Sequence, residues 1–271
     1  MKRLSLCLLA ATLGLAACSS HTAQYTSGSD YLSAYPQTVT TTATATSQGT
    51  ATSLDEAVRQ AAAVEPTLRF PAKIGVARIA RGKLTALPAT EAEAMLASLE
   101  RSGRYGTFTP VDPLTARLAR DSVGGPVYDD RGRSRGDGLG GVLSTARIGA
   151  ARQHLDAVLI YEVGVRGDTR NTGLAFADLT IIGGAILPTR SLTAKAVANA
   201  VLIDVRNGYR YGSASAEKDV EKLFTSWGSD KRAEELRIEV AAQAIEELAP
   251  EVEAMFAELE SAMTNAQLAS R

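Results

Sequence analysis

The segment before Cys18 constrains this chain more than any other. Lys2 and Arg3 give a short basic start, and the stretch from Leu4 to Ala17 is almost wholly apolar. A basic start, an apolar stretch of about 14 residues and small residues before a cleavage point are typical of a secretory signal. Because a permanent membrane-spanning helix needs about 20 apolar residues, residues 1–17 are expected to be removed. The mature chain is then expected to fold outside the cytoplasm.

Cys18 follows this segment directly. The tetrad Leu15-Ala16-Ala17-Cys18 resembles the lipobox of bacterial lipoproteins. The resemblance implies that the Cys18 thiol is diacylated, that the peptide before it is cut, and that the new amine receives another acyl chain such as palmitate. Ser19 stands where an aspartate would retain such a protein at the inner membrane. The resemblance therefore implies a lipid-anchored protein on the periplasmic side of the outer membrane. An ordinary signal peptide followed by a chance cysteine is the alternative.

The mature chain cannot rely on a disulfide. Cys7 lies in the expected leader and Cys18 is the expected acylation site, so no free pair of thiols would remain in an oxidising periplasm. With 45% hydrophobic and 22% charged residues, the chain can instead bury a core in one domain of ordinary size. Loss of Lys2 and Arg3 leaves 27 basic against 30 acidic side chains, a net charge of −3. That balance offers no global attraction for nucleic acid.

Composition divides the mature chain into a tether and a domain. Residues 18–52 are rich in Ser, Thr, Ala, Gly and Gln and have almost no charge, so burial cannot offset the entropy of ordering them. They are expected to form a flexible, lipid-anchored tether that reaches roughly 30–35 Å. Tyr31 to Pro36 is an exception, since its tyrosines and leucine could dock on the domain or on a partner. Residues 53–264 are expected to form a single α/β periplasmic domain, and residues 265–271 a tail.

Helical signals occur at four places in the domain. Residues 53–64 and the residues after Thr90 begin with capping boxes, in which Ser or Thr is followed three residues later by Glu. Residues 142–154 have helical periodicity, and a long C-terminal helix is expected from about residue 229. Pro250 is expected to kink that helix or to start a second one.

Strand signals alternate with these helices. Residues 73–79 and 105–111 are β-prone, and 156–163 is a continuous apolar run typical of a central strand covered on both faces. Residues 194–205 are expected to form a further strand, with one face that carries Val197, Val201, Ile203 and Val205. Asn207-Gly208 predicts a type I′ hairpin turn, in which both central residues need positive φ. The fold class is therefore α/β (α+β), a mixed β-sheet flanked by helices with a long C-terminal helix.

Two stretches break this pattern. Residues 122–141 are expected to form a mobile polar loop. Its basic side chains could bind phosphate, lipid A or an acidic glycan, although nearby aspartates largely cancel their charge. The candidate partner loop consists of Arg131, Arg133 and Arg135. The apolar stretch Leu174–Leu187 fits a buried strand pair or short helix, and it also fits insertion into a membrane or a subunit interface.

Motifs for catalysis and for cofactors are sparse. Gly136–Gly141 formally matches the dinucleotide fingerprint, but the strand that this function requires does not precede it. We therefore expect a flexible glycine-rich loop and no cofactor. His154 has no paired nucleophile motif, and Glu162 could act as an unusual acid within an apolar strand. Since the chain has only two histidines and two cysteines, we predict no catalytic set and no metal site.

A family resemblance covers residues 70 to 260. Asp156 to Tyr161, the Thr180 to Gly183 turn, and Ala200 to Val205 before a reversing strand resemble the rhombotarget lipoproteins. The layout is similar, more distantly, to CsgG-like and TolB amino-terminal-like periplasmic domains. These families imply an α/β domain that binds envelope partners and carries no known catalytic set. This chain ends in Ala266 to Arg271 rather than in the sorting tail of some rhombotarget members, so cleavage by a rhomboid-type protease is not implied.

These observations give three functional hypotheses. The first is a non-enzymatic envelope lipoprotein that acts as a protein-binding or assembly module. The second, which the CsgG-like resemblance allows, is an oligomeric export or secretion-channel component in which Leu174–Leu187 or the strands after it form the contact between copies. The third is an envelope glycan or lipid hydrolase, for which Glu162 and His154 are the candidate groups.

Overall fold

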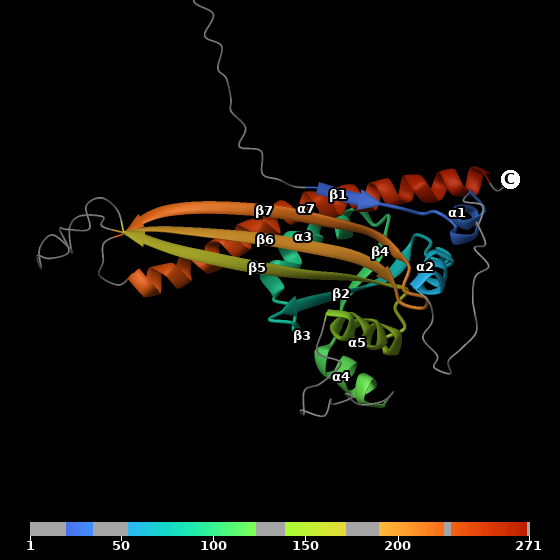
Figure 1. Ribbon diagram of the computed structural model, residues 1–271, viewed down its shortest axis with the longest axis horizontal. Helices are drawn as coiled ribbons and strands as arrows, with labels where there is room; N and C mark the ends of the chain where they lie inside the picture. The colour runs from blue at the N-terminus through green and yellow to red at the C-terminus, as the bar shows by residue number, and fades with distance from the viewer. Residues whose placement is uncertain (1–19, 35–53, 123–138, 172–189, 225–228, 270–271) are drawn as a thin grey trace, which may run out of the picture.

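The computed structural model describes residues 20–34, 54–122, 139–171, 190–224 and 229–269. Within these ranges a seven-stranded mixed sheet carries helices on both faces (Figure 1), which confirms the expected α+β class. Several sequence predictions concern residues outside these ranges. They are the predictions for Cys18, Ser19, Arg131, Arg133, Arg135, the start of the Gly136–Gly141 loop, and Leu174–Leu187.

Strand β2 (Ala72–Ala80) organises the parallel part of the sheet. Helix α3 (Ala89–Ser102) follows it and leads into β4 (Gly106–Pro110), which pairs parallel with the first half of β2. The short β3 (Lys83–Thr85) turns back antiparallel along the second half of β2. Parallel neighbours cannot be joined by a tight turn and need a crossover such as α3. The predicted strand–helix–strand unit is therefore present.

Three long strands form an antiparallel meander beside β2. They are β5 (Ala157–Asn171), which is parallel to β2, followed by β6 (Arg190–Asp204) and β7 (Arg210–Phe224). Strand β1 (Ser20–Ala23) pairs antiparallel with β7 and completes the order β1-β7-β6-β5-β2-β3. The first five residues of β5 are buried on both faces of the sheet, as predicted for a central strand.

One face of the sheet packs under helix α7 (Ser229–Ala269), which runs the length of the meander (Figure 1). The strand residues beneath it are mostly small, because β6 contributes a row of buried alanines to this core: Ala194, Ala196, Ala198 and Ala200. On the helix side, the predicted stripe Leu236, Val240, Ala244 and Leu248 is buried, together with the large side chains of Met255, Phe256 and Leu259. Small residues on the sheet therefore face mostly larger residues on the helix in one buried layer.

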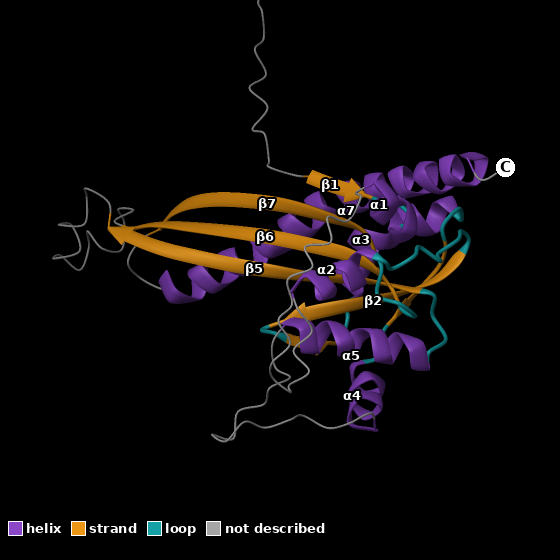
Figure 2. Cartoon of the chain, turned by 45° about the vertical axis from the view of Figure 1, so that its right-hand side comes forward, coloured by secondary structure: helices purple, strands orange, loops and turns teal. Residues whose placement is uncertain are grey.

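The opposite face is covered only in part. Helix α5 (Leu139–Arg152) packs over β2 and the start of β5, and α4 (Pro113–Ser122) lies outside it (Figure 2). The second core between α5 and the sheet contains Val158, Ile160 and Ile203. Beyond Tyr161 the outward residues of β5 are exposed. The outer half of the meander therefore presents an uncovered sheet face, as antiparallel sheets often do.

The expected tether is wrong for residues 20–34. This segment forms β1 and the helix α1 (Gly28–Ala34), and both lie on the body of the protein (Figure 1). Although the segment is polar, the edge of β7 offers it a row of unpaired backbone groups, and paired backbone groups stabilise a strand whatever its composition. The next helix along the chain, α2 (Leu54–Ala62), agrees with the helix predicted for residues 53–64. Residues 35–52 lie outside the described ranges.

Boundary predictions are corrected at three helices. Residues 265–269 belong to α7 rather than to a tail, and α7 continues through Pro250, so no second helix starts there. Pro250 is exposed, so water can reach the carbonyl left without a backbone donor. Helix α5 begins at Leu139, which puts Gly140 and Gly141 in a helix instead of a loop. Helix α3 begins at Ala89 after Pro88 with no side-chain cap, so the predicted capping box at Thr90 is wrong.

The connection between β6 and β7 is a hairpin, but not of the predicted turn type. Gly208 has φ of 80°, whereas Asn207 is not in the positive-φ region. The turn is instead held by the Asp204 carboxylate, which accepts hydrogen bonds from the backbone N–H groups of Arg206 and Asn207 at 2.8 and 3.2 Å. A side chain that satisfies the turn amides replaces the tight two-residue turn.

Candidate functional site

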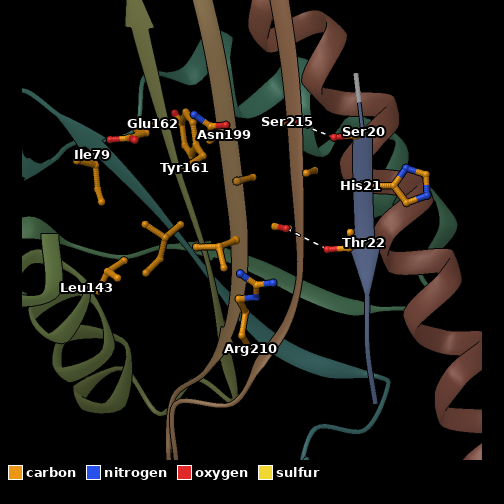
Figure 3. A pocket seen from close by; sticks show the side chains of 15 residues that line it. Ser20, His21, Thr22, Ile79, Leu143, Tyr161, Glu162, Asn199, Arg210 and Ser215 are labelled. Atoms are coloured by element: carbon orange, nitrogen blue, oxygen red, sulfur yellow. Dashed lines mark hydrogen bonds between the residues drawn. The ribbon is translucent and has the colours of Figure 1, made fainter. Parts of the chain in front are cut away.

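The uncovered sheet face contains a groove of about 380 Å³ between helix α5 and strand β1 (Figure 3). Its lining residues come from strands β1, β7, β6, β5 and β2 and from helix α5. Apolar side chains lie on the α5 side, and small hydroxyl side chains lie on the β1 side. The residues that line the groove include Ser20, Thr22, Ile79, Leu143, Ile160, Glu162, Asn199, Val201, Arg210, Ser213 and Ser215.

Hydroxyl pairs form the β1 side of the groove. Ser20 and Ser215 approach through their side-chain oxygens at 3.0 Å, and Thr22 and Ser213 do the same at 3.0 Å. These pairs follow directly from the register, since both are opposite residues of β1 and β7. Hydroxyls can donate as well as accept, so this wall could exchange hydrogen bonds with a bound segment. His21, the next residue along, lies on the other face of the sheet beside α7.

Charged groups lie at the two ends of the groove. Glu162 and Asn199 are opposite each other in the β5–β6 register at one end, and Arg210 lies at the other (Figure 3). Arg210 pairs with Ile203 of β6, and Ile203 is four residues along this strand from Asn199. Four residues of strand span about 13 Å. The groove therefore suits an extended segment of a few residues better than a compact polar ligand.

The two candidate catalytic residues do not share a site. Glu162 is exposed at the groove, whereas His154 is exposed in the turn before β5, where it has φ of 56°. The part of β5 that separates them, Ala157 to Glu162, spans about 17 Å. An acid and a base that act on one bond must both be within hydrogen-bond reach of it. These two side chains therefore cannot work as a pair.

A half-buried ion pair between Arg78 and Glu91 lies behind the groove and links α3 to the sheet. Arg78 donates to Glu91 through Nε at 2.7 Å and through Nη2 at 3.0 Å, and the Tyr161 hydroxyl donates to Glu91 at 2.6 Å. Burial, followed by the contact with the Glu91 carboxylate, raises the pKa of Tyr161 well above its ordinary value of 10.0. Tyr161 therefore stays neutral and donates. All three groups have partners, so this cluster is structural.

A second network was not visible in the sequence. Asp204 is fully buried and accepts hydrogen bonds from the hydroxyls of Tyr211 and Thr67, both at 2.7 Å. The Tyr211 hydroxyl in turn accepts from the backbone N–H groups of Thr67 and Leu68 at 3.0 and 2.7 Å. Burial and then the bond to Asp204 raise the pKa of Tyr211 far above 10.0. Only the tertiary fold brings residues this far apart in sequence together.

Residues 20–30 are held to the body by bonds beyond the β1 ladder. His21 Nδ1 lies 2.7 Å from Glu251 of α7, and the Tyr25 hydroxyl donates to the carbonyl of Leu68 at 3.0 Å. The backbone N–H and carbonyl of Thr26 both bond the Tyr209 hydroxyl, at 2.9 and 3.0 Å. Together with the β1 ladder, these contacts make residues 20–30 part of the body rather than of a flexible tether.

Helix α1 is held at its first turn by Glu65. One oxygen of this carboxylate accepts from the backbone N–H of Ser29 at 2.8 Å and from the Ser27 hydroxyl at 3.1 Å. These bonds, with the Ser29 backbone bond as the largest cause, lower the pKa of Glu65. A carboxylate at the first turn of a helix also complements the positive end of the helix dipole.

Neither metal ligands nor membrane spans stand out in the part of the chain that the structure describes. In these residues no three side chains of the His, Cys, Asp and Glu types are grouped as a metal ion would require. The helices of the same ranges are all too short or too polar to cross a bilayer. The sequence-predicted candidates for lipidation, sorting and the partner loop lie outside the described ranges, so those stay predictions.

Comparison with known proteins gives only distant matches. No protein-family model and no curated protein matches the chain. Two PelC dodecamer structures from Paraburkholderia phytofirmans have 18% and 17% identity and TM-scores of 0.29 and 0.28, over 68% of this chain and 91% and 90% of theirs. Lipoprotein GNA1162 from Neisseria meningitidis has 18% identity and a TM-score of 0.25, over 63% of this chain and 96% of its own. Similarity at these TM-scores establishes neither a shared fold nor a shared function.

Proposed function

We propose that this protein is a lipoprotein anchored through Cys18 to the periplasmic side of the outer membrane. The observation that carries the proposal is the order of residues at the N-terminus: a basic start, an apolar stretch, and Leu15-Ala16-Ala17 directly before Cys18. Three acyl chains, at about 0.8 kcal/mol for each buried CH₂, would hold the protein on the bilayer permanently. Ser19 after the cysteine favours export from the inner membrane.

We further propose that the anchored body binds another envelope protein rather than catalysing a reaction. The support is the groove, which combines the apolar side chains of Ile79 and Leu143 with paired hydroxyls along β1. Such a lining can bind an extended peptide segment through apolar contacts on one side and hydrogen bonds on the other. The separation of Glu162 from His154 along β5 counts against the hydrolase hypothesis, because these were its only candidate groups.

Fatty-acid labelling tests the anchor. Cells that express the full chain are grown with a clickable palmitate analogue, and the label on the protein is compared among wild type, Cys18→Ala and Cys7→Ala. The matched control is Cys7→Ala, which removes the other cysteine of the same N-terminal region. We expect label on wild type and on Cys7→Ala and none on Cys18→Ala. Equal label on Cys18→Ala would overturn the proposal.

Density-gradient separation of the membranes tests sorting in the same cells. Wild type is expected in the outer-membrane fractions, and Ser19→Asp is expected to move to the inner-membrane fractions while its acylation is unchanged. Identical distributions for both proteins would remove the outer-membrane assignment.

Site-specific photo-crosslinking tests the binding role. A photoreactive amino acid replaces Asn199, which is exposed in the groove, and in a matched chain it replaces Leu118, which is 63% exposed on α4. We expect a discrete protein adduct from position 199 that is absent from position 118. The same adducts from both positions, or none from the groove, would contradict the proposal. Hydrolysis of envelope glycan and lipid that is the same in wild type and in the Glu162→Gln, His154→Gln double variant would remove the only candidate groups of the hydrolase alternative.

A further inference from the structure

Strand β1 begins very close to the proposed acylation site. Only Ser19 separates Cys18 from Ser20, the first residue of β1. Two residues of extended chain span at most about 7 Å. If Cys18 carries acyl chains, it lies at the level of the lipid headgroups. The Cα atom of Ser20 must then lie within about 7 Å of that level, rather than at the end of a long tether.

Strand β1 is firmly part of the sheet, so the anchor constrains the whole body. Its four residues pair with Gly212–Ser215 of β7. The strand lies close against β7 and α7, because a Cβ atom on Gly212 would lie 2.4 Å from the Thr22 carbonyl oxygen and 2.8 Å from Met255 Cγ of α7. The bonds of His21, Tyr25 and Thr26 described above continue this attachment past the strand.

The anchor point lies part of the way along the longest dimension of the body. Ser20 pairs with Ser215, and β7 runs from Arg210 to Phe224. The nine residues after Ser215 extend about 30 Å to one side, and the five before it about 17 Å to the other. Both lengths exceed the reach of about 7 Å from Cys18. An upright body would therefore have to push one end of β7 into the bilayer.

Neither end of β7 is suited to the hydrocarbon region. On the long side, Glu217, Lys218, Asp219 and Glu221 follow one another within five residues. On the short side, β7 begins with Arg210, and Arg206 lies in the hairpin just before it. Ionised groups are expensive in a bilayer, so upright orientations are excluded and the strands must run along the surface. Since β1 is the edge strand in the order β1-β7-β6-β5-β2-β3, the edge opposite β3 is the one that meets the membrane.

We propose that the β1 edge of the sheet is the lipid-facing surface of this protein, and that the three long strands lie along the bilayer surface. This inference rests on the proposed acylation of Cys18. It also gives the groove a position, because Ser20 and Thr22 line it. The groove then opens beside the headgroup layer, and a partner would be met at the membrane surface.

Depth-dependent fluorescence quenching tests the orientation. The acylated mature protein is placed in phosphatidylcholine vesicles that contain a lipid with a nitroxide on its headgroup. A fluorophore is attached to a single introduced cysteine. Three positions are compared: Thr22→Cys on β1, Asp219→Cys on β7 beyond the end of β1, and Lys83→Cys on β3. All three residues are exposed, and Lys83 lies five strand spacings from β1, about 24 Å.

The inference predicts strong quenching at positions 22 and 219 and background quenching at position 83. Position 219 separates the orientations, because an upright body with this end outward would lift it about 14 Å further from the surface than Ser215. Insertion of a 20-residue Gly/Ser linker between Ser19 and Ser20 should reduce quenching at positions 22 and 219 to the background level seen at position 83. Phosphatidylcholine has no net charge, so the readout reflects geometry rather than charge attraction.

The outcomes separate the two proposals. Acylation is measured on the same samples with the palmitate analogue. A protein without label overturns the lipoprotein proposal. A labelled protein in which position 219 is quenched no more than position 83, or in which the linker changes nothing, overturns the orientation and leaves the anchor intact.

Discussion

Replacing Ala198 with leucine would test which face of β6 belongs to the core. Ala198 has no exposed surface and lies in the sheet layer that packs under α7. Its neighbours across the sheet are Val163 of β5 and Ala216 of β7, and both point to the same face. Leucine adds three carbon atoms to a layer in which the alanines already let the helix approach closely.

The expected cost follows from overpacking. Extra methylene groups in a well-packed core cost about 1–3 kcal/mol, because side chains leave their preferred rotamers or the backbone shifts. A loss of that size lowers the Tm of a domain of this length by roughly 2–4 °C for each kcal/mol. The matched control is Val197→Thr, one residue earlier and on the open face. It should change stability by less than about 0.5 kcal/mol, because water can solvate the new hydroxyl.

Urea unfolding monitored by circular dichroism measures both variants in a mature chain that carries Cys18→Ser for solubility. We expect a lower midpoint for Ala198→Leu with an unchanged slope, and a midpoint near wild type for Val197→Thr. If Ala198→Leu is neutral while Val197→Thr is destabilising, the packed face has been assigned to the wrong side of β6.

Three further predictions follow from buried or bonded groups. Phe256→Ala should cost about 3–5 kcal/mol in urea unfolding, because the fully buried ring contacts three other aromatic rings; Ile238→Ala, at a position that is 64% exposed on the same helix, is the control, and equal losses would refute the assignment. A double-mutant cycle of Asp204→Asn and Tyr211→Phe should give a coupling of about 1.5–3 kcal/mol, and strict additivity would disprove their direct bond. The pKa of Glu65 is lowered in the fold from its ordinary 4.5, so its contribution is present above that pH and lost as pH falls through the lowered value. Hydrogen exchange of α1, corrected for intrinsic rates, should therefore accelerate on acidification in wild type, and in Glu65→Gln it should already be fast at neutral pH; an unchanged acid response in the variant would assign the effect elsewhere.

Local sequence signals predicted the elements whose stability is local. Hydrophobic periodicity identified β2, α3, β5 and α7, because apolar residues at strand or helix spacing can be buried in only one way. One helix was missed despite a clear signal. Asp112 stands directly before Pro113, the first residue of α4, and its carboxylate accepts a hydrogen bond from the Thr115 backbone N–H at 2.7 Å. This Asp-Pro start is a recognised helix signature.

Face assignment in β6 could not be made from the sequence. The valines of this strand are more hydrophobic than the alanines that alternate with them, so hydrophobicity alone favours burial of the valine face along the whole strand, and the structure buries that face only at its end. Ile203 and Val205 do pack under α5, whereas Val197 lies on the open face and is only half-buried. The alanine face became the core because a long helix packs over it, and only small side chains leave room for that helix.

The chain's own residues determine a leader and cysteine typical of a lipoprotein, the absence of a disulfide scaffold, and the α+β class. The place of residues 20–34 depended on the tertiary structure, because a polar segment has no burial pattern and gains its order from a strand edge formed by residues nearly two hundred positions away. For the same reason, the Asp204–Tyr211 network and the groove appear only when distant strands pair. The short distance between Cys18 and a paired strand, and with it the proposed orientation on the membrane, likewise depends on where β1 binds.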